Sequence, residues 1–283
     1  MTKPSLTSDI PAIMRAVHQI SDDEPKILAD PIAPKLVDVA AQDLDAQWLA
    51  PILGHPFAPQ WRAGFLIRSR YAEDCLAEGV ARGLGQYVIL GAGLDTFAYR
   101  QPGWARALHI FEVDSPATQR VKRARIAAAD VAPPDNLTFV SIDFETASLG
   151  EALRATGFAF DRGAFCSWLG VTQYLTAAAI ESTLALVLTL PRGSEIVLSF
   201  VLPQEMLSGI EADAMATAAA RAAEVGEPWL SRLHPADVAA QLDRMGFSEV
   251  VLLTPEQARE RYLKNRRDRL TGRRGEQLIR AIV

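Results

Sequence analysis

The chain has 283 residues, 49% of them hydrophobic, and 29 Lys and Arg against 34 Asp and Glu give a formal net charge of −5. Such a length can bury a sizeable core within one α/β domain, and the negative charge offers no general field to attract nucleic acid. The first ten residues lack the apolar core of a signal peptide, and no later segment is apolar over a membrane-spanning length. We therefore expect a cytoplasmic protein without a membrane partner.

Helix-like stretches interrupted by prolines occupy residues 9–84 and predict a helical N-terminal cap over residues 1–85. The last helix of the cap is expected to end at Gly83 and Gly85. Its apolar stripe consists of Ala72, Leu76, Val80 and Leu84, which are spaced four residues apart. Arg70 falls on another face and is therefore free to reach a ligand. Tyr71 is a candidate wall of a substrate pocket, with packing in the core as the alternative.

An apolar run at residues 86–90 ends in the turn Gly91-Ala92-Gly93, followed by Asp95. The glycines permit positive φ and carry no Cβ that would keep a ligand away from the backbone. A dinucleotide site needs a third glycine where this chain has Thr96, which disfavours a pyrophosphate. Asp95 favours an ammonium group and repels phosphates. A simple connection between a strand and a helix stays open as the alternative.

A second apolar run follows at residues 109–114 and ends in the acids Glu112 and Asp114. They lie roughly twenty residues beyond the glycines, where folds of this kind bind ribose hydroxyls. The alternative is a helix start, with Asp114 or Ser115 as the N-cap and Pro116 in the first turn. Both uses are compatible, because only one residue is needed as a cap.

Four ordered motifs resemble the leucine carboxyl methyltransferase-like family of class I S-adenosylmethionine-dependent methyltransferases. They are Arg70-Tyr71 with Glu73-Asp74, the run 91–96 with Tyr99-Arg100, the run 111–114, and the run 168–175. The likeness extends from about Ala12 to the C-terminus. It implies S-adenosyl-L-methionine as the cofactor.

The resemblance also implies a role for individual residues. Arg70 matches the arginine that binds the methionine carboxylate, a planar anion suited to a guanidinium. The acid that binds the ribose corresponds to Asp114, and the pair that meets the adenine corresponds to Asp143 and Phe144. Much of the family has Glu-Gly where this chain has Leu169-Gly170, so neither the glutamate's cofactor contact nor the family's substrate preference carries over. The predicted cofactor-binding residues are Arg70, Gly91, Ala92, Gly93, Asp95, Glu112, Asp114, Asp143, Phe144 and Leu169.

From residue 86 onward apolar strands alternate with helical segments, which is typical of a mostly parallel sheet. Strands are expected near 87–91, 108–113, 137–142, 163–169, 195–201, 248–253 and 277–282, with helices near 116–130, 147–156, 176–190 and 235–245. The predicted fold is α/β, a Rossmann-like class I methyltransferase sheet of about seven mostly parallel strands with helices on both faces and a helical N-terminal cap. Residues 1–283 form one domain, with the cap at 1–85, the core at 86–283 and an alanine-rich insertion near 203–229 over the substrate pocket.

The predicted function is methylation of an oxygen, on a carboxylate or hydroxyl of a small molecule. Methyl transfer from a sulfonium is an in-line displacement that requires alignment and exclusion of water, with no metal or covalent residue. A carboxylate acceptor is already ionised near pH 7, whereas a hydroxyl benefits from a base. Tyr174 is a candidate substrate contact, with a packing role as its alternative, and no catalytic residue is assigned. A nicotinamide-dependent oxidoreductase and a non-catalytic nucleoside-binding member stay open, and the oligomeric state is not predicted.

Overall fold

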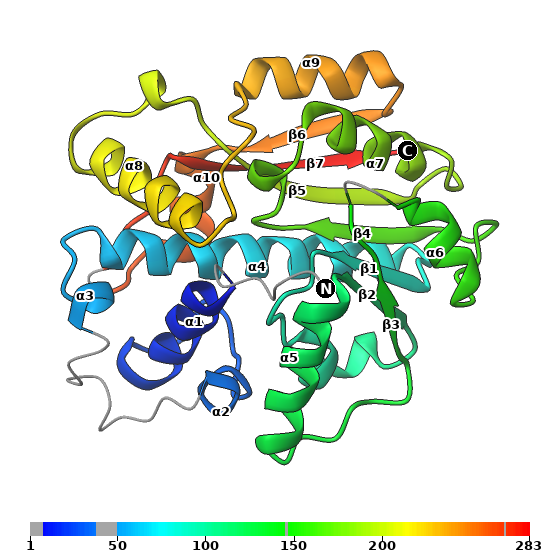
Figure 1. Cartoon of the computed structure of the whole chain (residues 1–283), viewed down its shortest axis with the longest axis horizontal. Coiled ribbons are helices and arrows are strands. Elements are labelled where there is room, and N and C mark those ends of the chain that lie inside the picture. Colours follow the sequence, from blue (N-terminus) through cyan, green and yellow to red (C-terminus); the bar gives the residue numbers. More distant parts are fainter. Residues whose placement is uncertain (1–7, 38–49, 145–146, 269) are drawn as a thin grey trace.

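A computed structural model describes residues 8–37, 50–144, 147–268 and 270–283. Its centre is a seven-stranded sheet with the strand order β3-β2-β1-β4-β5-β7-β6 (Figure 1). Neighbours among β1 to β5 pair in parallel, while β7 runs antiparallel to both β5 and β6. The strands are β1 (Gln86–Leu90), β2 (His109–Asp114), β3 (Leu137–Ser141), β4 (Ala164–Trp168), β5 (Glu195–Val201), β6 (Glu249–Leu253) and β7 (Glu276–Ile282). The mostly parallel sheet is confirmed, and each strand boundary lies within one residue of its prediction.

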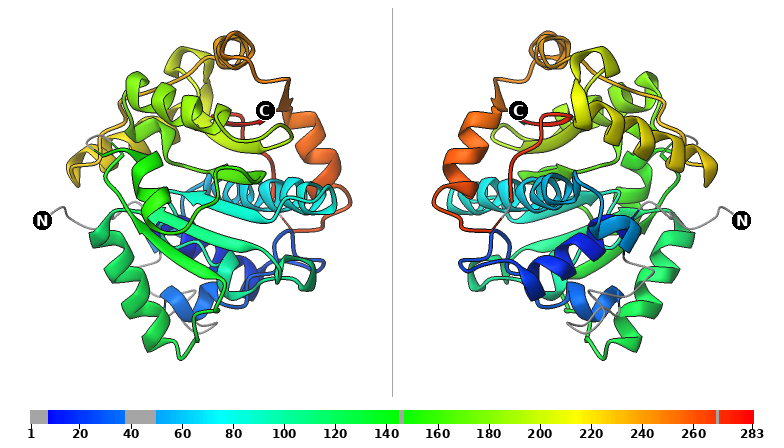
Figure 2. Two further views of the ribbon diagram at one scale, coloured as in Figure 1. Left: turned by 90° about the vertical axis from the view of Figure 1, so that its right-hand side faces the viewer. Right: turned by 90° about the vertical axis from the view of Figure 1, so that its left-hand side faces the viewer.

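Helices cover the sheet on both faces (Figure 2). Val88 and Leu90 of β1 pack in the core cluster that also holds buried side chains of α6 (Leu149–Ala155), α7 (Ala177–Leu188) and α9 (Pro235–Met245). Tyr87 and Ile89 pack on the other face against α4 (Ala58–Ala81). Successive strand residues point to opposite faces, so the unbroken apolar run of β1 serves both layers.

The end of α4 and the bounds of the other helices complete the fold. Helix α4 ends at Ala81, and Gly83 takes a φ of +104° while the Leu84 amide donates to the Gly79 carbonyl, so the predicted stop at Gly83 is confirmed. No helix in the described parts of the chain is long and apolar enough to cross a membrane. The other helices are α1 (Asp9–Ser21), α2 (Ala33–Val37), α3 (Ala50–Leu53), α5 (Pro116–Ala128), α8 (Gly209–Glu224), α10 (Pro255–Ala258) and a π-helical turn (Arg259–Leu263).

The expected cap divides into two parts. Helix α4 packs against the sheet and forms part of a covering layer, whereas α1 lies at the end of the sheet where α8 also lies (Figure 1). Helix α8 occupies most of the predicted insertion near 203–229. Residues 1–7 and 38–49 of the expected cap lie outside the described residues.

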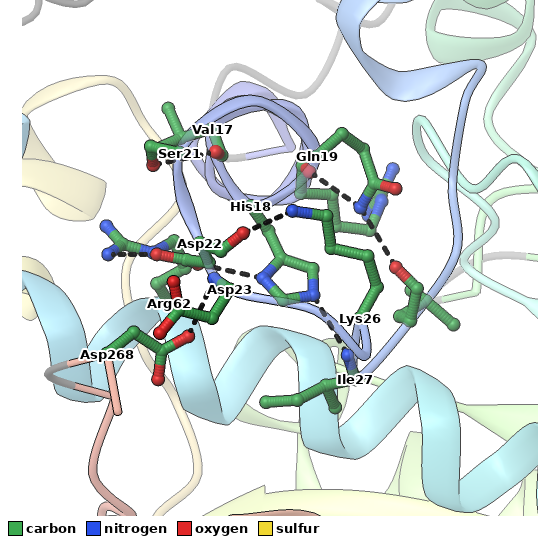
Figure 3. Close-up of polar contacts among 12 residues, drawn as sticks. Val17, His18, Gln19, Ser21, Asp22, Asp23, Lys26, Ile27, Arg62 and Asp268 are labelled. Carbon is green, nitrogen blue, oxygen red and sulfur yellow. Dashed lines mark hydrogen bonds and ion pairs between the residues drawn. The ribbon is translucent and has the colours of Figure 1, made fainter. Parts of the chain in front are cut away.

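A buried polar cluster joins α1 to α4 (Figure 3). His18 Nδ1 lies 2.8 Å from Asp22 Oδ2, and its Nε2 accepts from the Ile27 amide at 3.0 Å. The ring therefore donates from Nδ1 to Asp22. Arg62 of α4 donates to both Asp22 oxygens, from Nε at 2.7 Å and from Nη2 at 2.8 Å. Because the Asp22 side chain is only 4% exposed, this bidentate pair fixes where α1 sits on α4.

We predict that Asp22→Ala lowers the free energy of unfolding by about 3 to 5 kcal/mol, because it leaves the Arg62 guanidinium without its buried partner. Asp23→Ala is the matched control, since its side chain is exposed and removes the same charge one residue away. Chemical denaturation of both variants checks this. Equal stabilities for the two variants would show that the cluster does not fix α1.

Candidate functional site

A cavity of about 740 Å³ lies at the carboxyl ends of β1 to β4, bordered by residues of α1, α4 and α8. β1 and β4 are neighbours in the sheet although β2 and β3 intervene in the chain. Ligands of open α/β sheets bind at such a reversal of strand order. The predicted site residues that line the cavity are Gly91, Ala92, Gly93, Asp95, Asp114, Asp143, Phe144, Leu169 and Tyr174.

The glycine turn adopts the backbone that its sequence predicts. Gly91 and Gly93 have φ values of +66° and +45°. A Cβ at Gly91 would lie 2.3 Å from Val171 Cγ2, so only glycine allows this close approach to the loop after β4. A Cβ at Gly93 would lie 3.3 Å from Ser8. The turn therefore brings bare backbone to the cavity.

Asp114 holds the turn from the end of the neighbouring strand. Its Oδ2 accepts from the Gly93 amide at 2.6 Å, and its Oδ1 accepts from the Ser115 amide at 2.6 Å. Burial raises the pKa of the Asp114 carboxyl, and these two amides oppose the rise. Ser115, not Asp114, is the N-cap of α5, accepting from the Thr118 amide at 3.2 Å. Asp114 is thus oriented toward the turn.

Glu112, expected beside Asp114 in the cofactor site, lies in a buried ion pair. Its side chain is 1% exposed, does not line the cavity, and lies 2.6 Å from Lys122 Nζ of α5. Burial raises the pKa of the Glu112 carboxyl to about 7 against the opposing attraction of Lys122. Glu112, two residues before the end of β2, faces α5, whereas Asp114 at the end of β2 reaches the cavity.

Arg70 and Tyr71 also lie elsewhere than expected. Arg70 pairs with Asp74 at 2.7 Å, donates to the Ile27 carbonyl at 3.4 Å, and is 44% exposed, outside the cavity lining. Tyr71 is 3% exposed and packs in the core between α4 and the sheet. Neither residue therefore lines the cavity that the other predicted site residues share.

Arg68 is the α4 arginine that lines the cavity. Residues two positions apart on a helix point in directions that differ by roughly 200°, so Arg68 and Arg70 lie on nearly opposite faces of α4. Arg68 lies four residues before Ala72 and continues the buried stripe of Ala72 and Leu76. This spacing is the sequence signal that could have identified it.

Arg15 is a second cavity residue that the sequence analysis missed. Its Nε lies 3.0 Å from Asp30 Oδ2, and its Nη2 donates to the Leu94 carbonyl at 2.6 Å. Thr96 also donates to Asp30 Oδ2, at 2.7 Å. The residue at the place of a third glycine therefore helps to fasten α1 beside the turn, and the departure from the dinucleotide pattern has a structural use.

Apolar and aromatic side chains enclose the part of the cavity contributed by α4, α8 and the segment after α8. These residues are Trp61, Phe65, Met215, Ala218, Ala222, Val225 and Trp229. The chain has four histidines, all within the described residues, and none lines the cavity. The cavity thus has a polar region at the strand ends and a mostly apolar region under α8, which Thr217, Arg221 and Glu227 also line.

The leucine carboxyl methyltransferase family model matches residues 10–188. A Bacillus subtilis (strain 168) protein described as "Putative S-adenosyl-L-methionine-dependent methyltransferase YktD" is 32% identical over 207 residues, 73% of this chain and 68% of its own length. A protein of Mycolicibacterium paratuberculosis (strain ATCC BAA-968 / K-10) with the same description, apart from the name YktD, is 32% identical over 230 residues, 78% of this chain and 70% of its own.

Solved structures share the fold at low identity. A duf574 family protein from Streptomyces avermitilis MA-4680 matches with a TM-score of 0.61 and 14% identity, over 99% of this chain and 97% of its own. The two chains therefore share one α/β fold. Together with the family match over most of the cavity-forming residues, this places the chain in the leucine carboxyl methyltransferase family.

Proposed function

We propose that the chain is an S-adenosylmethionine-dependent O-methyltransferase that acts on a carboxylate or hydroxyl group of a small molecule. The observation that carries the proposal is the meeting of the Gly91 to Gly93 turn, Asp114 and Arg68 on one cavity. The family to which the chain belongs supports the same cofactor and reaction type.

The residues present suit each part of S-adenosylmethionine. Arg68 is the proposed partner of the methionine carboxylate among the arginines that line the cavity, and Asp95 suits its ammonium group. Asp114 would accept from the ribose hydroxyls, and Asp143 with Phe144 would meet the adenine. Leu169, which also lines the cavity, would offer the cofactor only an apolar contact.

When bound, the cofactor supplies a methyl group on a positively charged sulfur. For transfer to an ionised acceptor oxygen, the cavity would have to hold that oxygen in line with the methyl group. Charge is neutralised in this step, so the walls contribute by aligning the acceptor and excluding water. The apolar region under α8 suits both tasks.

The lack of a histidine in the cavity lining favours a carboxylate acceptor over a hydroxyl. A carboxylate is ionised near pH 7 and needs no base, whereas a hydroxyl profits from one. All four histidines lie outside the cavity lining. His18 uses both ring nitrogens in the contacts to Asp22 and Ile27. A nicotinamide-dependent oxidoreductase is disfavoured, because Thr96 fills the place of the glycine that a pyrophosphate needs.

We predict that Arg68→Gln raises the dissociation constant of S-adenosylhomocysteine at least about tenfold, because a partner of a buried charged contact is lost. Arg70→Gln is the matched control and should leave the constant within about twofold, since Arg70 pairs with Asp74 outside the cavity. Titration calorimetry measures both. A larger effect for Arg70→Gln would restore the assignment made from sequence and refute the role of Arg68.

The reaction itself is tested by incubating the protein with methyl-labelled S-adenosylmethionine and a panel of matched aromatic acids and phenols. We expect label in a base-labile methyl ester of an acid, which releases methanol in alkali, whereas an aryl ether does not. Label only in phenol ethers would refute the preference for a carboxylate. Absence of transfer to every compound, with S-adenosylhomocysteine still bound, would favour the non-catalytic alternative.

A further inference from the structure

Three charged side chains from distant parts of the chain meet at the cavity. Arg68 Nη1 of α4 lies 2.9 Å from Glu276 Oε1 at the start of β7. Arg273, in the segment before β7, pairs with the other oxygen of the same carboxylate. The three side chains are 12%, 6% and 6% exposed for Arg68, Arg273 and Glu276, and all three line the cavity.

The two guanidinium groups pack against one aromatic ring and against two glycines that leave space for them. Both lie 4.8 Å from the centre of the Phe65 ring. A Cβ at Gly64 would lie 2.1 Å from Arg273 Nε, and a Cβ at Gly170 would lie 2.6 Å from Arg68 Nη1. The arginines therefore occupy spaces that any side chain at these two positions would close.

In the described part of the chain, Glu276 is the one carboxylate in ion-pair contact with these two arginines, while Asp95 and Glu211 attract them from farther away. Burial lowers the pKa of Arg68 to about 10, opposed by Tyr174 and Asp95. Burial and then the charge of Arg68 lower the pKa of Arg273 to about 9, opposed by Glu211. Both arginines remain protonated near pH 7. A buried positive charge without its own partner is costly, so the cluster favours a further anion.

The carboxylates of Glu211 and Asp95, near the cluster, accept hydrogen bonds from backbone amides. Glu211 Oε1 accepts from the amides of Arg274 and Gly275 at 2.7 Å each. Asp95 Oδ1 accepts from the Phe97 amide at 2.7 Å. A carboxylate arriving at Arg68 would give that guanidinium a second direct anionic partner beside Glu276.

We propose that Arg273 is a positioning residue for the cofactor carboxylate: through Glu276 it orients Arg68 and provides the second positive charge of that subsite. This inference rests on the proposed function. It makes the segment before β7 part of the cofactor site, and it implies selection for ligands that keep the amino-acid carboxylate. Arg273 acts through Arg68 and takes no part in the transfer.

The test compares two ligands that share the adenosine part. S-adenosylhomocysteine carries the amino-acid carboxylate, and 5′-methylthioadenosine lacks it. In calorimetry on the full chain, Arg273→Gln should weaken S-adenosylhomocysteine about tenfold while 5′-methylthioadenosine stays within about twofold. Arg274→Gln, an exposed neighbour outside the cavity lining, should leave both unchanged. Arg273→Lys keeps the positive charge near pH 7, and because the second charge is the proposed contribution, it should keep the ratio of the two constants within about threefold of the parent.

Equal weakening of both ligands by Arg273→Gln, or no weakening of either, would overturn the inference. A tenfold loss of the ligand ratio in Arg273→Lys would also overturn it, even where Arg273→Gln fails to fold. If Arg68→Gln discriminates between the ligands and Arg273→Gln does not, only this inference fails. If Arg68→Gln does not discriminate either, the proposed cofactor geometry fails with it.

Discussion

The hydrogen bond from the Gly93 amide to Asp114, 2.6 Å long, is the contact on which the site depends. It joins the end of β2 to the turn after β1, and the Gly91 and Ala92 amides reinforce it by donating to the Val113 carbonyl. The positive φ of Gly93 directs its amide to this carboxylate. The same carboxylate that shapes the turn also lines the cavity, so the geometry of the turn and the proposed contact to ribose are linked.

Around this turn, the fold brings arginines from remote segments to one cavity. Arg15 comes from α1, Arg68 from α4 and Arg273 from the segment before β7. Burying such charges is costly unless they are paired, and Asp30 and Glu276 provide part of the compensation. The bidentate pair of Arg62 and Asp22 links α4 to the end of α1, the two helices that carry the first two arginines. We interpret the incomplete compensation as preparation for a ligand carboxylate.

The sequence predicted the sheet well because buried parallel strands are short apolar runs, and the run of β1 is fully buried on both faces. The glycine turn and Asp114 were predictable for a similar reason, since backbone conformation and strand position determine them. The resemblance pointed to Arg70 by residue type, whereas the face of the helix places Arg68 at the cavity, and which arginine binds the cofactor is a matter for the proposed titration. Arg273 and Glu276 carry no local signal, because only the antiparallel course of β7 beside β5 brings them to α4.

A crystal structure of the protein with S-adenosylhomocysteine tests the central claim most directly. The account predicts the ligand carboxylate within hydrogen-bond distance of Arg68, the ribose hydroxyls on Asp114, and the sulfur directed toward the apolar region under α8. A ligand whose carboxylate contacts Arg70, or whose ribose lies away from Asp114, would contradict it.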